Sequence, residues 1–256
     1  MKIIDFHAHP FLDASQRVTF YPIDDPDTPA FTKQKVLDSG ISHICSSVIK
    51  ADGSFNMREL NDAALKLRDI FGADFYTPGF HIHPGQVEES IAEIERMHKE
   101  GVHLIGELVP YMHGWQQFDV WPCIDELNTM LDVAQKYNMV LSYHILWHWP
   151  IEPVIAAHPN MPFVAAHPGG KEDVDKHIER MRKYDNAYLD LSGTGIMRYG
   201  CLRRLVNEVG ADRLLFGTDY PLRQQALYVQ AVMTEGLKET DLEKIFHGNA
   251  ERLLKL

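Results

Sequence analysis

The run IIDFHAH at residues 3–9 places two histidines, His7 and His9, two residues apart near the start of the chain. The apolar residues of this run indicate a β-strand, on which side chains two residues apart point the same way. Both imidazoles would then leave one strand end together, a geometry suited to binding a single metal ion. On a helix the pair would diverge, because residues at i and i+2 do not face each other. A chance pair is the alternative, so the ends of the later strands decide between the two.

Further metal-binding residue types stand at the ends of later predicted strands. The chain has 14 histidines, which makes some coincidence expected. In a parallel barrel, however, the carboxyl ends of all strands meet at one face, where the active site lies. The residues that would meet there are His7, His9, His81, His83, Glu107, His144, His167 and Asp219.

Other histidines have simpler explanations. His98, His158 and His177 fall at predicted helical or turn positions, where we expect them on the surface. His43 and His103 lie inside predicted strands, where a hydrogen-bonded structural role is expected.

Eight short apolar segments, rich in β-branched and aromatic residues, predict the strands that position these side chains. They cover residues 3–6, 41–48, 75–80, 102–108, 139–143, 162–166, 187–191 and 213–217. Amphipathic helical stripes lie between them, for example at residues 60–71, 87–97, 127–134 and 202–209. This alternation implies parallel strands joined by helical crossovers. Eight such units, 256 residues and no Gly-X-Gly-X-X-Gly or Walker A segment favour an α/β fold, a single-domain (β/α)8 TIM barrel over residues 1–256.

Composition limits the partners. The net charge is −11, from 36 acidic and 25 basic residues, and no Lys/Arg-rich stripe appears, which argues against nucleic acid and anionic membranes. Three scattered cysteines are typical of reduced thiols in a cytosol. The first predicted strand leaves no room for a signal peptide, and no apolar run approaches the roughly 18–20 residues of a membrane span. We therefore expect a cytoplasmic protein with a small-molecule substrate, which could form a homo-oligomer.

Five motifs in this order resemble those of the amidohydrolase superfamily of metal-dependent barrel enzymes, specifically the branch often called amidohydrolase 2. The resemblance covers nearly the whole chain. The last motif is similar to the start of that branch's final helix, with Asn249 as its N-cap. The motifs are DFHAH (5–9), SYH (142–144), AHPGG (166–170), LFGTDYP (215–221) and HGNAERLL (247–254).

The resemblance implies a ligand set. His7, His9 and Asp219 match the ligands of the more buried metal. His144 and His167 match the histidines of strands five and six. In binuclear members these two bind a second metal, whereas in mononuclear members one is a ligand and the other works on the substrate.

Glu107 helps to distinguish these cases, because it ends the fourth predicted strand where binuclear relatives place a bridging carboxylate or a carboxylated lysine. We expect its side chain to share a face with Ile105 and to point into the barrel, where an unpartnered carboxylate would be costly. An ion pair with another cation is the alternative.

Two metals are favoured, and the ligand types suit Zn²⁺, with Mn²⁺, Fe²⁺ and Co²⁺ left open. Asp5 could support His7 or be a satisfied polar group deeper in the barrel.

A bound divalent cation lowers the pKa of water to about 7 and polarises a carbonyl or phosphoryl oxygen. As the family implies, Asp219 would orient that water, accept its proton and pass it to the leaving group. His83, or His167 if one metal binds, would hydrogen-bond the developing oxyanion. The segment HIHP (81–84) is also similar to the third-strand motif of related metal-dependent deoxyribonucleases, although the two histidines could merely line the mouth.

Hydrolysis of a small ester, lactone or amide is the leading functional prediction. Its rival is metal-dependent decarboxylation of an aromatic or unsaturated carboxylic acid, a lyase reaction of the same branch whose members generally use one metal. Hydrolysis of small phosphoesters and a non-catalytic metal-binding barrel are further alternatives.

Loops beyond the strands would select the substrate. Residues 11–30 form a long proline-bearing segment that could be a lid, and Arg198 and Arg223 could hold a carboxylate or be surface arginines. Aromatic residues after strands four and five, including Tyr111, Trp121 and Trp149, suit a flat ring, with rim packing or a subunit interface as the alternative. The candidate substrate-binding residues are His81, His113, Trp115, Trp147, His148 and Arg223.

Overall fold

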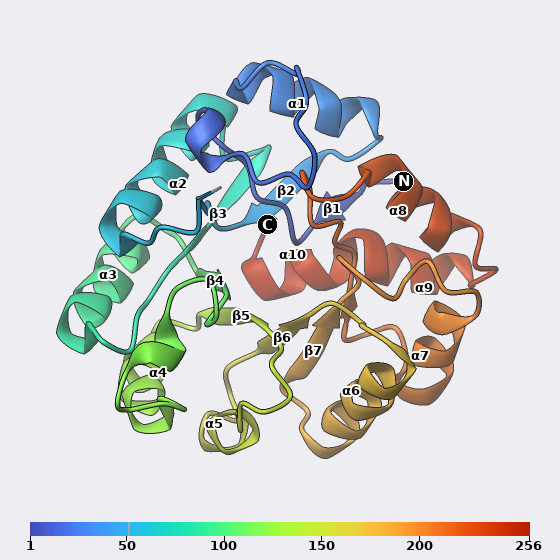
Figure 1. Ribbon diagram of the computed structural model, residues 1–256. Helices are drawn as coiled ribbons and strands as arrows, with labels where there is room; N and C mark the ends of the chain where they lie inside the picture. Colours follow the sequence, from blue (N-terminus) through green and yellow to red (C-terminus); the bar gives the residue numbers. More distant parts are fainter. Residues whose placement is uncertain (51) are drawn as a thin grey trace.

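Eight parallel strands form one sheet in which each strand pairs with the next along the chain (Figure 1). The computed structural model describes residues 1–50 and 52–256. Every predicted strand is present, most of them shortened by a residue or more at one or both ends. The strands are β1 (Ile4–Asp5), β2 (His43–Ser46), β3 (Tyr76–Phe80), β4 (Leu104–Leu108), β5 (Val140–His144), β6 (Phe163–Ala166), β7 (Ala187–Asp190) and β8 (Leu214–Leu215).

The first and last strands are joined by backbone hydrogen bonds that close the sheet. The amide of Phe6 donates to the carbonyl of Phe216 at 2.8 Å, and the amide of Asp219 donates to the carbonyl of His7 at 2.8 Å. Beyond the strand ends, Ala8 and Tyr220 form a parallel bridge. The predicted TIM-barrel class is therefore confirmed.

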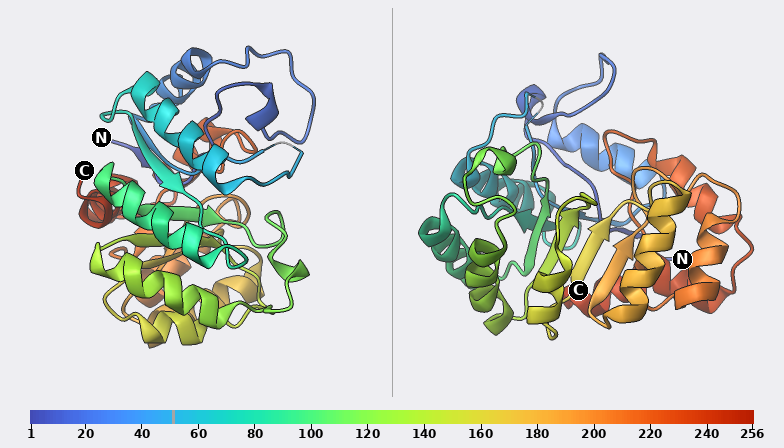
Figure 2. Two further views of the ribbon diagram at one scale, coloured as in Figure 1. Left: turned by 90° about the vertical axis from the view of Figure 1, so that its left-hand side faces the viewer. Right: turned by 60° about the horizontal axis from the view of Figure 1, so that its bottom comes forward.

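Helices surround the strands on the outside of the barrel (Figures 1 and 2). The four predicted amphipathic stripes all fall within helices, and their apolar residues face the sheet. The helices are α1 (Pro29–Asp38), α2 (Met57–Phe71), α3 (Val87–Lys99), α4 (Ile124–Lys136), α5 (Glu152–Ala157), α6 (Lys171–Lys183), α7 (Cys201–Val209), α8 (Gln225–Met233), α9 (Glu239–Glu243) and α10 (Asn249–Leu254). Three short turns complete the set: η1 (Ala14–Gln16), η2 (Trp115–Gln117) and η3 (Lys244–Gly248).

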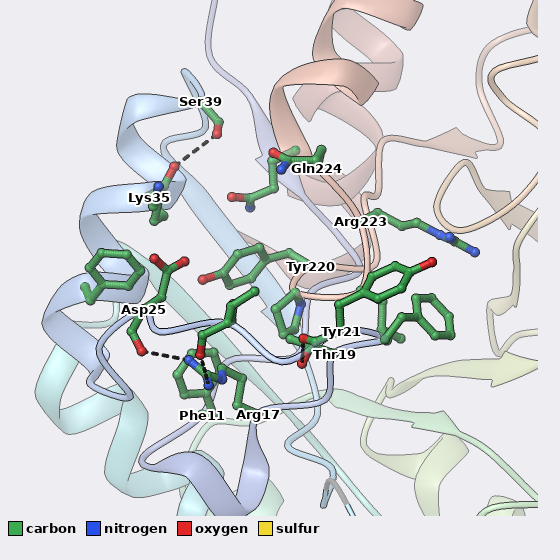
Figure 3. Close-up of a pocket in the computed structure, with 16 residues that line it drawn as sticks. Phe11, Arg17, Thr19, Tyr21, Asp25, Lys35, Ser39, Tyr220, Arg223 and Gln224 are labelled. Atoms are coloured by element: carbon green, nitrogen blue, oxygen red, sulfur yellow. Dashed lines mark hydrogen bonds between the residues drawn. The ribbon is translucent and has the colours of Figure 1, made fainter.

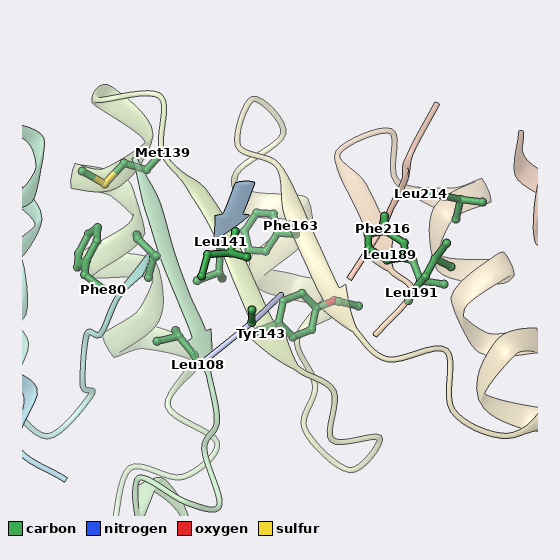
Figure 4. Close-up of a cluster of buried hydrophobic side chains, with 14 of the residues drawn as sticks. Phe80, Leu108, Met139, Leu141, Tyr143, Phe163, Leu189, Leu191, Leu214 and Phe216 are labelled. Atoms are coloured by element: carbon green, nitrogen blue, oxygen red, sulfur yellow. The ribbon is translucent and has the colours of Figure 1, made fainter. Parts of the chain in front are cut away.

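Two apolar clusters hold the barrel together. The larger lies between the strands and the helices, where residues such as Leu141, Tyr143 and Phe163 point outward (Figure 4). The smaller fills the barrel with inward-facing residues of the strands and includes Ala250 and Leu254 of α10. Because α10 packs against this interior cluster at the amino end of the strands, the carboxyl end is left for the polar site.

The structure corrects one prediction about the C-terminal helix. Asn249 is not the N-cap of α10 but its first residue, and its side chain is fully buried. The side-chain amide donates to the carbonyls of Ala211 and Leu214, both at 2.7 Å. Asn249 therefore ties the last helix to β8 and to the turn that precedes it.

Two histidines predicted to lie on the surface are buried instead. His158 donates from Nδ1 to the carbonyl of Val154 at 2.9 Å, and His177 donates from Nε2 to the carbonyl of His167 at 3.1 Å. His177 lies on the inward side of α6. The sequence predicts no amphipathic stripe over this helix, so the buried position of His177 was not expected. His43 is hydrogen-bonded within the sheet as predicted.

Among residues 1–50 and 52–256, none of the helices combines the length and the apolar character that crossing a membrane requires.

Candidate metal centre

The carboxyl ends of five strands, β1, β4, β5, β6 and β8, bring the predicted metal ligands into one cluster. Donor atoms of His7, His9 and Glu107 lie within 4.8 Å of one another, and so do those of Glu107, His144 and His167. Asp219 joins them from the loop after β8. The structure thus places all six residues together, although His7 and Asp219 are more than two hundred positions apart in the chain.

Four of these side chains surround one point. The Nε2 atoms of His7 and His9 are 3.2 Å apart. Oε2 of Glu107 lies 3.2 Å from His7 Nε2 and 3.5 Å from His9 Nε2, and Oδ1 of Asp219 lies 3.7 Å from each. Two imidazole nitrogens and two carboxylate oxygens are a donor set that divalent transition metals accept.

The other oxygen of Glu107 faces a second donor set. Oε1 lies 3.0 Å from Nδ1 of His144 and 3.7 Å from Nε2 of His167. One carboxylate therefore presents each of its oxygens to a different pair of histidines. This is the arrangement of a carboxylate that bridges two cation positions.

The local backbone of β4 explains how Glu107 reaches the centre, and it corrects the predicted face. Ile105 belongs to the outer apolar cluster, so Glu107 does not share its face. The register between β4 and β5 shifts between Ile105 and Leu108, which turns the Glu107 side chain inward. Gly106 is required here, because it has φ +97° and an added Cβ would lie 2.1 Å from the carbonyl oxygen of Ser142.

Partners behind the histidines hold their free nitrogens toward the cluster. Nδ1 of His7 lies 2.9 Å from Oδ2 of Asp190, and Nδ1 of His9 lies 3.0 Å from the carbonyl oxygen of Ser47. Each contact places the ring proton on Nδ1 and leaves the lone pair of Nε2 directed at the other ligands. The hydroxyl of Ser192 contacts Nδ1 of both His7 and His167, at 3.1 and 3.0 Å. These residues fit a divalent metal ion.

Sequence reasoning missed Asp190 and Ser192. Asp190 is the last residue of β7, but the predicted strand ran to residue 191 and so placed Asp190 one residue inside the strand. Asp5, which sequence left open between two roles, contacts none of the ligand side chains with its carboxylate. It accepts hydrogen bonds from the backbone amides of His7 and Thr218, at 3.1 and 2.9 Å, and so fixes the loop that carries Asp219.

The charged groups of the cluster shift one another's pKa values. Burial favours the neutral form of Glu107, but the neighbouring His7 and hydrogen bonds from His144 and His7 prevail and hold the pKa of Glu107 well below its usual range. Burial also opposes protonation of His7, yet Glu107 and Asp190 raise its pKa well above its ordinary value. The buried carboxylates of this centre thus require nearby positive charge, which a divalent cation would supply.

A cavity of about 300 Å³, here called the metal cavity, opens over the cluster. Tyr111 stands beside the ligands, with its ring centroid 5.2 Å from that of His144. Of the six predicted substrate-binding residues, Arg223 is the one that lines this cavity. Its wall is formed by His9, Phe20, Ile49, Glu107, Val109, Tyr111, Met112, His144, His167, Gly193, Thr194, Asp219, Leu222 and Arg223.

Three histidines after β3 and β4 lie beside the metal cavity but not on its wall. His81 is buried and donates from Nε2 to the carbonyl of Val48 at 2.8 Å, and burial lowers its pKa to about 4. His83 and His113 line a separate cavity with Phe55, and Nε2 of His83 donates to the carbonyl of His113 at 3.1 Å. The structure therefore does not place His83 where it would contact an oxyanion in the metal cavity.

The remaining predicted substrate residues pack on the rim. Trp115 is fully buried against Trp149, with ring centroids 5.8 Å apart. Trp147 lies against α6, beneath the ammonium of Lys176 at 4.7 Å, and His148 is exposed to solvent. None of these three side chains lines the metal cavity.

Comparison with curated proteins finds a short region of similarity. The chain is 38% identical over 72 residues to the gamma-resorcylate decarboxylase of Polaromonas sp. strain JS666. The matched segment is 28% of this chain and 22% of that protein, so it spans well under two thirds of the relative.

Several solved structures share the whole fold at low sequence identity. The 2,6-dihydroxybenzoate decarboxylase from Rhizobium has a TM-score of 0.73 and 16% identity, covering 100% of this chain and 99% of its own. A probable 2-pyrone-4,6-dicarboxylic acid hydrolase from Acinetobacter baumannii has a TM-score of 0.71 and 16% identity, with 100% of both chains covered. A dihydroxybenzoic acid decarboxylase from Polaromonas sp. JS666, with bound manganese and 2-nitroresorcinol, has a TM-score of 0.65 and 17% identity, covering 100% and 97%.

The amidohydrolase family model matches residues 4–256, which include every ligand of the cluster. The match agrees with the barrel fold. The chain therefore belongs to the amidohydrolase family.

Proposed function

We propose that this protein is a divalent-metal-dependent enzyme that decarboxylates a small aromatic or unsaturated carboxylic acid. The observation that carries the proposal is the metal cavity itself, where the ligand cluster, apolar side chains and Arg223, which has no anionic partner among the described residues, meet. The relative with 38% identity over 72 residues is named as a decarboxylase of an aromatic acid, which supports this reaction over the hydrolysis that we favoured from sequence.

The ligand set divides between two positions. His7, His9, Asp219 and Oε2 of Glu107 would hold one cation, and His144, His167 and Oε1 of Glu107 would hold a second. When bound, a divalent cation polarises oxygen atoms of the substrate. Manganese is supported by its presence in one decarboxylase of the same fold, and the nitrogen and oxygen donors also suit zinc.

Arg223 would bind the substrate carboxylate. The chain has twelve arginines, and the other eleven each donate a hydrogen bond to a carboxylate or a carbonyl. Among the described residues, Arg223 has no such partner, and its buried Nε is unsatisfied. A guanidinium presents donors in a fork that matches a carboxylate, so an acid entering the metal cavity would satisfy it.

Asp219 would handle the proton. Decarboxylation breaks the bond between the carboxyl carbon and its neighbour, releases CO₂ and leaves an electron pair on the neighbouring carbon, which then takes up a proton. Asp219 lines the metal cavity and its side chain is 10% exposed, so its carboxyl can reach a bound substrate. General acid–base catalysis by a positioned side chain contributes about 10²–10⁴-fold to a rate.

The test is CO₂ release from a panel of aromatic acids that begins with 2,6-dihydroxybenzoate, using protein reloaded with Mn²⁺ or Zn²⁺. We expect metal-dependent CO₂ release that Arg223→Met lowers by about tenfold or more in kcat/KM, since a charged hydrogen bond to the acid is lost. Arg198→Met, which removes an arginine outside the metal cavity, is the control. No CO₂ from any acid of the panel with metal restored would refute decarboxylation.

Hydrolysis of a small ester, lactone or amide is a second candidate, favoured by one observation. Glu107 divides its oxygens between two donor sets, as a bridging ligand in a two-metal centre does. In this reaction Asp219 would accept a proton from water rather than deliver one to carbon. Turnover of a lactone or ester panel by protein that releases no CO₂ from aromatic acids would decide for hydrolysis.

A further inference from the structure

A second cavity adjoins the metal cavity across a thin wall of side chains. This side cavity, of about 390 Å³, lies between residues 17–27, helix α1 and the segment after β8 (Figure 3). Phe20, Leu222 and Arg223 line both cavities and so form the wall between them.

Phe20 is the part of this wall that the fold leaves free. Phe20 is 64% exposed, whereas Leu222, in the segment after β8, is half-buried. The loop that carries Phe20 is held mainly to itself, because Arg17 donates to the carbonyls of Asp25 and Ile23 at 2.8 and 3.1 Å. This loop projects at the mouth of the barrel as the blue segment between η1 and α1 (Figure 2).

Arg223 faces both spaces and is covered by Phe20. Its guanidinium carbon lies 5.2 Å from the centroid of the Phe20 ring, and Nε is buried without a partner. A carboxylate bound to this guanidinium would therefore lie at the wall, with the metal cavity on one side and the side cavity on the other.

The side cavity offers aromatic walls to the apolar part of such a ligand. Phe11, Phe31 and Tyr220 line it, and Figure 3 shows the Tyr220 ring in its centre. Lys35 adds a second cation, whose ammonium lies 5.3 Å from the Phe31 ring. The side cavity is thus suited to a second aromatic ring of a ligand whose carboxylate is held by Arg223.

We propose that Phe20 limits the length of the carboxylate ligand. With Phe20 in place, a single-ring acid fills the metal cavity, and when Phe20 is removed the two cavities join and admit a two-ring acid. The inference rests on the proposed function only in taking a carboxylic acid as the ligand, and it does not depend on which reaction follows.

Calorimetric titration of the Mn²⁺-loaded protein with benzoate and with biphenyl-2-carboxylate, whose carboxylate lies beside both rings, tests this proposal. Phe20→Ala is expected to tighten binding of the two-ring acid by about tenfold relative to benzoate, because one more aromatic ring is buried. Phe20→Trp is expected to shift the ratio the other way. Tyr21→Ala is the matched control, since Tyr21 is an exposed aromatic residue of the same loop that lines the side cavity alone, and it should leave the ratio unchanged.

An unchanged ratio in Phe20→Ala, an equal change in Tyr21→Ala, or no binding of either acid to any of these proteins would overturn the proposal. The exposure of Phe20 makes misfolding of the variant unexpected, and an unchanged melting temperature verifies this. If the acids bind with the predicted selectivity but release no CO₂, the length limit stands and the proposed reaction fails.

Discussion

Nδ1 of His7 lies 2.9 Å from Oδ2 of Asp190, and both side chains are completely buried. The contact fixes the orientation of the imidazole and keeps its proton on the side away from the cluster. Nε2 of His7 is consequently directed at Glu107 and His9, where a cation would lie. Asp190 thereby orients an imidazole whose other nitrogen faces the rest of the cluster.

Asp190→Asn should weaken metal binding by about 10–100-fold while leaving the barrel folded, because an amide holds the His7 ring less firmly and can select the wrong tautomer. The dissociation constant for Mn²⁺, measured by competition with a chelator, checks this. Asp185→Asn, at an exposed position a few residues earlier, is the control. Wild-type affinity in Asp190→Asn would show that the contact has no such role.

Asp219→Asn should remove most turnover and leave the fold intact. The amide keeps the shape of the side chain but cannot hold or release a proton, so we expect kcat to fall by about 10²–10⁴-fold. Rates of CO₂ release, or of ester hydrolysis if that proves to be the reaction, give the measurement. Near-wild-type turnover with the true substrate would eliminate the proton-transfer role.

Metal removal should destabilise the protein. The cluster gathers buried carboxylates and imidazoles that would bind a cation in the folded chain, and a ligand at 100 times its dissociation constant adds about 2.7 kcal/mol to the free energy of unfolding. Thermal unfolding with and without a chelator should show a lower melting temperature in the stripped protein, restored by added Mn²⁺ or Zn²⁺. Identical melting temperatures would mean that the cluster binds neither ion.

His177 should make the fold sensitive to acid. Burial, assisted by Arg180, lowers the pKa of His177 to about 3, from 6.5 in the unfolded chain. Between these values the unfolded state binds the additional proton, so the free energy of unfolding falls as the pH is lowered from 6.5 towards 3, by about 1.4 kcal/mol per pH unit for this group. His177→Gln, which keeps a donor for the carbonyl of His167, should flatten that dependence.

Chemical denaturation of the metal-free proteins at several pH values between 4 and 7 measures the effect. The difference between wild type and His177→Gln isolates this one group from the other histidines. His148→Gln, at an exposed position, should follow the wild-type curve. Parallel curves for wild type and His177→Gln would contradict the prediction.

Sequence reasoning reached the fold and the ligand cluster because both depend on local patterns. Apolar runs predict strands, and a barrel then brings the ends of those strands to one face, so His7 and Asp219 could be paired without knowing any distance. The residues that support the histidines of the cluster were not predicted, because their role depends on three-dimensional geometry. Asp190 sits in the segment Leu189-Asp190-Leu191, which reads as a strand interior, and nothing in the sequence shows that it faces His7.

The direction of individual side chains near the strand ends could also not be predicted from the sequence. The β4 register shift that turns Glu107 inward involves Gly106 and cannot be inferred from alternation, which predicted the inward side correctly for Glu107 but wrongly for Ile105. Aromatic residues near the mouth were equally ambiguous. Trp115 is buried and Phe20 is exposed at the cavity wall, and no sequence pattern distinguishes the two.

Two cations bridged by Glu107 are the central claim, and anomalous diffraction from crystals of the metal-loaded protein tests it most directly. We predict two peaks, one bounded by His7, His9 and Asp219 and the other by His144 and His167, with Glu107 between them. In Glu107→Ala we predict the loss of at least one peak. A single peak in the wild-type protein, or two peaks that persist without the Glu107 carboxylate, would contradict the bridging role.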